Sequence, residues 1–218
     1  MRIDVFTLVP HAFSAVSEQR PLASVLGGEL DLRLFNYRDW TPLGGGQVDD
    51  EPYGGGAGMV LRVDVAAAAL EGVYGGAPEH RVIALTPQGR QLDQGIVEEL
   101  AGEEHLTLLS ARFEGFDERI LMHLANDAIS IGPYVLSGGE LPAMVLLDAV
   151  ARRLPGALGE GSGDEESFSA GLEGGLEYPQ YTRPADFRGW GVPEVLVSGD
   201  HGRIADWRRD RSRERTLT

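Results

Sequence analysis

Strand-like and helix-like segments alternate along most of this chain, and this alternation limits the possible folds more than any other feature. Short apolar runs typical of buried strands are followed by segments with helical periodicity. The expected strands are Arg2–Val9, Leu30–Tyr37, Arg81–Thr86, Leu106–Ser110 and Ala128–Ile131. The expected helices are His11–Glu18, Val63–Leu70, Leu92–Leu100, Asp117–Leu124 and Leu141–Leu154. The pattern predicts an α/β fold with a parallel sheet flanked by helices.

The segments that follow three of these strands are candidate binding loops. Parallel sheets bind ligands beyond the carboxyl ends of their strands. The three segments are Leu85–Gly89, Ser110–Gly115 and Ile131–Gly139. Each contains glycine, which lets the backbone turn sharply or approach a ligand closely. We therefore expect a ligand site where these three strands end.

Composition excludes several kinds of site. The 218 residues include no Cys, which rules out disulfides, thiolate zinc sites and a cysteine nucleophile. The five His show no metal-ligand spacing, so no metal site is assigned. No apolar run approaches the roughly 20 residues of a membrane span, and the start of the chain does not resemble a signal peptide. We expect no membrane partner and a cytoplasmic location.

The formal net charge is −15, and all 19 basic residues are Arg. This balance argues against non-specific nucleic-acid binding by bulk charge. The sign reverses near the C-terminus, where Arg203–Arg215 holds six Arg against three acids. A local basic surface is therefore still compatible with the sequence.

Four motifs each allow a structural and a functional interpretation. Ser137–Glu140 is either a helix capping box or a close backbone approach to a ligand. The Gly-rich stretch Asp49–Met59 is either a solvated acidic turn or a holder of hydrated Mg²⁺. Asp164–Glu166 is either a solvated charge run or a mobile general base. Arg152 and Arg153 either interact favourably with the negative end of the helix dipole or stabilise negative charge on a substrate oxygen.

The order of the motifs along the chain resembles one family closely. The blocks that carry the resemblance are Val48–Met59, Pro87–Arg90, Arg112–Arg119, Ser130–Met144 and Tyr181–Pro184. The chain resembles the bacterial tRNA (guanine-N1-)-methyltransferases of the TrmD family from Met1 to about Thr216. The resemblance implies a tRNA (guanine37-N1)-methyltransferase, which transfers a methyl group from S-adenosyl-L-methionine to N1 of the guanosine 3′ of the anticodon.

The resemblance also implies an architecture. It predicts a SPOUT-type parallel sheet flanked by helices with a deep C-terminal trefoil knot, within residues 1–158. Residues 159–175 would form a flexible interdomain linker, in agreement with their Gly, Ser and acidic composition. Residues 176–218 would form part of a helical tRNA-binding domain, a small extension that looks truncated beside the family. The active site would lie at the subunit interface of a homodimer.

The three strand-end segments match the family's cofactor loops. The cofactor-binding residues implied are Leu85, Thr86, Pro87, Gln88, Gly89, Ala111, Arg112, Glu114, Gly115, Ile131, Gly132, Pro133, Tyr134, Val135, Leu136, Gly138, Gly139 and Pro142. Ala111 stands where the family usually has Gly, and Pro133 removes one backbone donor. Assistance by Mg²⁺ is a further family expectation.

The chemistry requires a base near guanine N1 and a cation or donor near O6. In the resemblance, Glu166 occupies the position of the family's catalytic Asp, and Arg152 matches its assisting Arg. The linker is one residue shorter than in the family pattern, which makes Asp164 a substitute candidate for the base. The alternative interpretation is a catalytically weakened tRNA-binding protein with the same fold.

Overall fold

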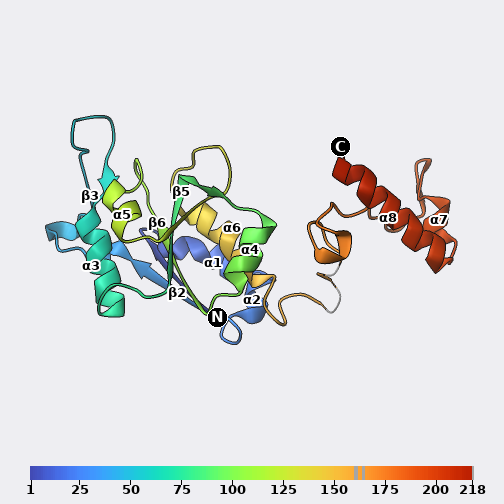
Figure 1. The fold of residues 1–218 in the computed structure, drawn as a ribbon, viewed down its shortest axis with the longest axis horizontal. Helices are drawn as coiled ribbons and strands as arrows, with labels where there is room; N and C mark the ends of the chain where they lie inside the picture. The colour runs from blue at the N-terminus through green and yellow to red at the C-terminus, as the bar shows by residue number, and fades with distance from the viewer. Residues whose placement is uncertain (160–161, 164, 218) are drawn as a thin grey trace. The chain divides into compact units, whose positions relative to one another are not determined.

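The computed structural model describes residues 1–159, 162–163 and 165–217, and it divides the chain into two compact units. The first unit is Met1–Ala157 and the second is Leu158–Thr218. Figure 1 shows the helices and strands of each unit. Within the described residues, none of the helices combines the length and hydropathy that a membrane span requires.

A parallel sheet forms the centre of the first unit, which confirms the predicted α/β class. Its strands are β1 (Arg2–Thr7), β2 (Asp31–Asn36), β5 (Arg81–Gln91), β6 (His105–Ser110) and β7 (Asp127–Ser130). The strand order is β2-β1-β6-β5-β7, and every neighbouring pair is parallel. The carboxyl ends of β5, β6 and β7 therefore lie side by side at one edge of the sheet.

Helices cover both faces of this sheet (Figure 1). They are η1 (Pro10–Phe13), α1 (Ser14–Ser17), α2 (Leu22–Val25), η2 (Tyr37–Asp39), η3 (Gly44–Gly46), α3 (Val63–Tyr74), α4 (Gln94–Ala101), α5 (Glu118–His123) and α6 (Glu140–Ala151). Phe6 packs in a cluster with residues of α3, whereas the next residue, Thr7, donates a hydrogen bond to Glu140 of α6. Because successive strand residues point to opposite faces, α3 and α6 lie on opposite sides of the sheet.

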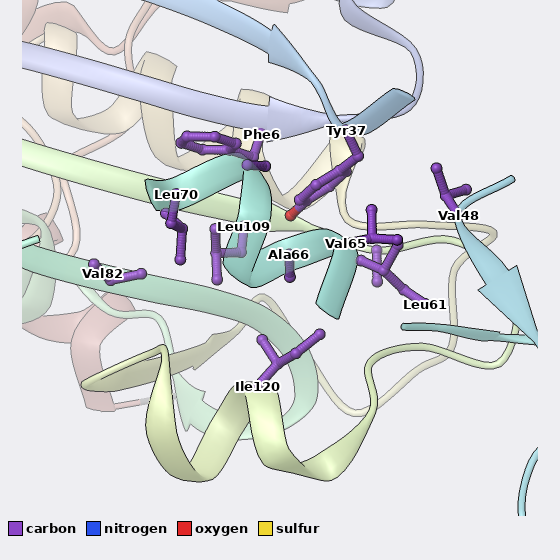
Figure 2. Packing of buried hydrophobic residues seen from close by; sticks show 12 residues of the cluster. Phe6, Tyr37, Val48, Leu61, Val65, Ala66, Leu70, Val82, Leu109 and Ile120 are labelled. Carbon is purple, nitrogen blue, oxygen red and sulfur yellow. The ribbon is translucent and has the colours of Figure 1, made fainter. Parts of the chain in front are cut away.

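The core on the α3 side joins distant parts of the chain (Figure 2). Phe6 of β1 and Leu109 of β6 pack against Val65 and Ala66 of α3. Ile120 of α5 is buried in the same cluster. All five side chains are fully buried. The small residues of the Ala-rich α3 allow the helix to approach the sheet closely, and α5 packs on α3.

Two segments near the candidate binding loops differ from what the sequence predicted. The strand expected at Arg81–Thr86 continues to Gln91, with a shift in its pairing to β7 between Leu85 and Arg90. The Gly-rich stretch contains a small antiparallel pair, β3 (Asp49–Asp50) and β4 (Val60–Leu61), joined by an exposed loop. Asp50 forms an ion pair with Arg62 at 2.7 Å, so this carboxylate is balanced by a neighbouring cation.

The second unit contains η4 (Ala170–Leu172), β8 (Asp186–Phe187), β9 (Trp190–Gly191), α7 (Glu194–Val197) and α8 (His201–Leu217). Residues near 176 are tied to α8: the Leu176 amide donates to Thr216 Oγ1 at 2.9 Å, and Ser212 Oγ donates to the Leu176 carbonyl at 2.7 Å. The described residues between 165 and 175 thus belong to the second compact unit.

Candidate functional site

A cavity of about 350 Å³ lies at the carboxyl ends of β5, β6 and β7. Its volume is in the usual range for sites that hold a cofactor or small ligand. Three loops line it, namely those that follow Leu85, Ser110 and Ser130. It is lined by all the residues predicted to bind a cofactor except Gly89 and Pro133.

The first loop is a short excursion from β5. Pairing between β5 and β7 stops at Leu85 and resumes at Arg90, so the four residues between them leave the ladder. Thr86 Oγ1 donates a hydrogen bond to the side chain of Gln88 within this excursion. A Cβ on Gly89 would lie 2.4 Å from the backbone nitrogen of Ile129. Gly89 therefore lets β5 return against β7, which explains why it supports the loop rather than lining the cavity.

The second loop follows β6 and is held from two sides. Phe113 and Gly115 both have positive φ, +61° and +110°, which turns the backbone sharply. The Glu114 amide donates to the Met59 carbonyl at 2.8 Å, and the Leu61 amide donates to the Gly115 carbonyl at 3.0 Å. The Gly-rich stretch thus fixes this side of the cavity, although its own loop is exposed.

The third loop connects β7 to α6 and passes close to the end of β6. The Gly139 amide donates to the Ala111 carbonyl at 2.8 Å. A Cβ on Gly139 would lie only 2.7 Å from Ser110 Cα, so no side chain fits at this position without a shift of the backbone. Tyr134 and Val135 of the same loop are 53% and 86% exposed, which leaves apolar surface at the cavity rim.

The start of α6 does not form the capping box that Ser137–Glu140 suggested. Gly139 is the N-cap, and it makes no side-chain capping hydrogen bond. Glu140 is buried, and its carboxylate accepts a hydrogen bond of 2.9 Å from Thr7 Oγ1. Arg112 Nε lies 3.9 Å from the same carboxylate. Glu140 therefore anchors the start of α6 to β1 and places its charge beside an arginine of the cavity wall.

Several lining residues were not predicted from the sequence. They are Phe113, Phe116, Glu118, Leu121, Ile129 and Ser130. Phe113 lies inside the motif block Arg112–Arg119, so the sequence could have indicated that it lines the cavity. Leu121 is different, because it belongs to α5 and reaches the cavity only through the packing of that helix.

Of the two proposed catalytic residues, Arg152 does not line the cavity and Glu166 belongs to the second unit. Arg152 is the C-cap of α6, whereas Gly139 and Pro142 at the start of this helix line the cavity. At 1.5 Å per residue, the span from Glu140 to Arg152 is about 18 Å. Glu166 is half-buried in the second unit, where its carbonyl accepts a hydrogen bond from the Ser169 amide at 3.0 Å. Asp164, the substitute base, lies outside the described residues.

The fold and the cavity together define an α/β protein with a candidate ligand site at the carboxyl ends of parallel strands. Residues 1–218 match the family model of the tRNA (Guanine-1)-methyltransferase TrmD, and the chain belongs to this family. Its expected membership is thereby confirmed.

Named relatives agree with this assignment. The chain is 52% identical over 219 residues to a tRNA (guanine-N(1)-)-methyltransferase of Geobacillus kaustophilus, covering 100% of this chain and 88% of the relative. It is 52% identical over 218 residues to the corresponding protein of Brevibacillus brevis, covering 99% and 88%. A relative from Dehalococcoides mccartyi is 48% identical over 220 residues, covering 100% and 88%. The family activity is enzymatic methylation of guanine N1 in tRNA. The alternative interpretation, a catalytically weakened tRNA-binding protein, is not favoured.

Proposed function

We propose that this chain methylates N1 of guanosine 37, the nucleotide 3′ of the anticodon, and that the cavity binds S-adenosyl-L-methionine. The observation that carries the proposal is the convergence of three separate loops on one cavity at the carboxyl ends of β5, β6 and β7. Gly89 and Gly139 let two of these loops pack closely against the neighbouring backbone. This combination suits an elongated ligand that forms most of its hydrogen bonds with backbone groups.

The cavity residues fit such a ligand chemically. Leu85, Ile131 and Leu136 supply apolar wall, and Glu114 brings a carboxylate to the same cavity. An apolar wall suits the adenine ring, and a carboxylate suits the positively charged amino group of the methionine part. Pro133 lies outside the cavity lining, so its missing N–H need not cost a ligand hydrogen bond.

The reaction needs guanine N1 to lose its proton. When bound, S-adenosyl-L-methionine supplies a methyl group attached to positively charged sulfur. The Glu166 carboxylate accepts the N1 proton, and the Arg152 guanidinium stabilises the negative charge that gathers on O6. The N1 electron pair then forms the bond to the methyl carbon as the bond between carbon and sulfur breaks. Holding both substrates in line contributes the rest of the rate enhancement.

A homodimer with its active site at the subunit interface is part of the proposal. Arg152 is about 15 Å along α6 from Pro142, the residue of this helix that lines the cavity. An Arg152 that acts on the reacting guanine is therefore better matched to the cavity of a second copy. The exposed Tyr134 and Val135 at the rim offer apolar surface that a second copy could cover.

The knot and the remaining family properties complete the proposal. We infer that the loop from β7 to α6 belongs to a deep trefoil knot, and the close packing of Gly139 on Ser110 supports such a threading. We infer a helical tRNA-binding role for residues 176–218 and a cytoplasmic location for the reaction. Among the described residues, no group of three or more His, Asp or Glu could hold a metal ion, and we assign no residues to Mg²⁺.

The test combines calorimetry and methyl transfer. S-adenosyl-L-methionine should bind the wild-type chain, and a tRNA transcript with G at position 37 should be labelled where one with A is not. Equal labelling of the two transcripts would contradict the choice of guanine N1. Glu166→Gln and Arg152→Ala should each lower the rate by about 100-fold or more while leaving cofactor affinity unchanged. Asp164→Asn is the matched control, and a larger loss there than in Glu166→Gln would move the base to Asp164.

A further inference from the structure

A small hairpin in the second unit exposes two aromatic rings and a cation. β8 and β9 pair through Asp186–Gly191 and Phe187–Trp190, and residues 181–191 are all exposed. Phe187 is 49% and Trp190 71% exposed, with ring centroids 5.8 Å apart at 61°. The guanidinium carbon of Arg188 lies 5.0 Å from the centroid of Phe187. These side chains form one compact group, which we call the hairpin tip: Phe187, Arg188 and Trp190.

The backbone of the turn does not favour an arginine. Arg188 and Gly189 have φ of +59° and +81°, so both central residues are left-handed, as in a type I′ turn. Asn or Gly adopts the first of these positions readily, whereas a residue such as Arg is strained there. Since the hairpin has only two residues in each strand, its aromatic rings do not build a core either. Folding alone therefore does not explain this choice of residues.

Charge indicates the kind of partner. Residues 178–218 contain eight Arg against six acidic residues, whereas residues 1–177 contain eleven Arg against 28 acidic residues. The positive balance of this stretch comes from Arg203–Arg215 of α8, which belongs to the same compact unit as the hairpin and holds six Arg against three acids. A polyanion is attracted to this basic segment. Flat rings beside an arginine are the groups with which proteins stack unpaired nucleobases and contact phosphate.

We propose that the hairpin tip binds an unpaired nucleotide of the tRNA substrate, with a base stacked on Trp190 or Phe187 and Arg188 at the adjacent phosphate. The proposal rests on the proposed function for the identity of the RNA. It assigns the tip to substrate binding and not to the chemical step, because the reaction is assigned to the cavity with Arg152 and Glu166.

The experiment measures affinity for a tRNA transcript separately from affinity for S-adenosyl-L-methionine. Trp190→Ala and Phe187→Ala should each weaken tRNA binding by about tenfold, the usual loss for one stacked base. Trp190→Phe, which keeps a ring, should retain most of the affinity. Val197→Ala removes another exposed apolar side chain of the same unit, 63% exposed, and should change nothing. Cofactor affinity and the rate at saturating tRNA should stay at wild-type values in all four variants.

Arg188→Asn provides a sharper test, because stability and binding should move in opposite directions. Asn suits the left-handed turn position, so the melting temperature should stay equal or rise. Loss of the cation should weaken tRNA binding and reduce the slope of log affinity against log salt by about one. A structural role alone would not produce this combination.

Three outcomes would overturn the proposal. Unchanged tRNA affinity in both aromatic variants would exclude stacking at the tip. A change in sedimentation from dimer to monomer on Trp190→Ala would assign the tip to a contact between copies of the chain. Equal losses for Val197→Ala would indicate a general defect of the second unit. Failure of the proposed function looks different: the wild-type chain would not methylate tRNA, while the hairpin variants could still weaken its binding.

Discussion

The imidazole rings of His80 and His105 stack face to face at the amino end of the sheet, with centroids 3.5 Å apart and planes inclined by 17°. His105 Nε2 lies 2.9 Å from Asp4 Oδ2, and His80 Nε2 lies 2.7 Å from Thr107 Oγ1. The Tyr74 hydroxyl, from α3, packs on the same group and donates to Asp4 at 2.7 Å. This cluster lies at the opposite end of the strands from the cavity.

The stacked histidines predict loss of stability in acid. Burial, and then the charge of His105, lower the pKa of His80 from 6.5 to about 4. Between these two values the unfolded chain binds a proton that the folded chain does not, so the free energy of unfolding falls as pH falls. The contribution is on the order of 1 kcal/mol once solvent screening is allowed for.

Urea unfolding at pH 7 and at pH 4.5 measures this effect. His80→Gln keeps a polar group near Thr107 that cannot titrate. Its free energy of unfolding should therefore fall less than that of the wild type between pH 7 and pH 4.5. His11→Gln, at an exposed position, serves as the control. Superimposable pH profiles for wild type and His80→Gln would refute the assignment.

Asp4→Asn tests the charge at the centre of the same cluster. The Asp4 side chain is fully buried, and burial alone would raise its pKa, but hydrogen bonds from Arg2, Tyr74 and His105 hold the pKa below its ordinary value. At pH 7 the substitution should lower the free energy of unfolding by about 2 kcal/mol, since hydrogen bonds to a charged group are lost. The difference from wild type should shrink once the pH falls below 3.8.

Asp31→Asn is the comparison for Asp4→Asn, because Asp31 pairs with Arg33 within β2, the strand beside β1, and both side chains are about half exposed. It should cost less than about 0.5 kcal/mol. Equal losses for both variants in denaturant unfolding would show that burial of Asp4 is not the source of the effect.

Gly139→Ala should disturb the cavity. The new Cβ would lie 2.7 Å from Ser110 Cα, and backbone atoms cannot yield as a flexible side chain can. We expect a loss of about 1–3 kcal/mol in stability and a marked fall in affinity for S-adenosyl-L-methionine. Gly76→Ala meets no atom within 4 Å and should leave both quantities unchanged. Wild-type cofactor affinity in Gly139→Ala would show that the third loop does not shape the site.

Thr7→Val should leave the buried Glu140 carboxylate without its 2.9 Å hydrogen bond. The expected cost is about 1–3 kcal/mol, the range for a buried acceptor that loses its donor. Thr7→Ser keeps the hydroxyl and should restore most of the loss in thermal unfolding. If Thr7→Val and Thr7→Ser were equally stable, the hydroxyl would not be what anchors α6.

The loops of the candidate site were predictable from the sequence because each is encoded locally. Leu85–Gly89, Ser110–Gly115 and Ile131–Gly139 each follow an apolar strand and contain glycine, and parallel strands bring their ends together. The order of the motif blocks then identified the family, which the comparison over residues 1–218 confirmed. Predicting the loops and the family did not require knowledge of which strands pair with each other.

Contacts between residues far apart in the chain were decided only by the tertiary structure. Leu121 lines the cavity although it belongs to α5, a helix that packs on α3, and Thr7 meets Glu140 across 133 positions of sequence. The continuation of β5 past Gly89 likewise depends on its fit against β7. Periodicity and turn residues specify local backbone conformation, whereas side-chain partners are chosen by which elements the whole core brings into contact.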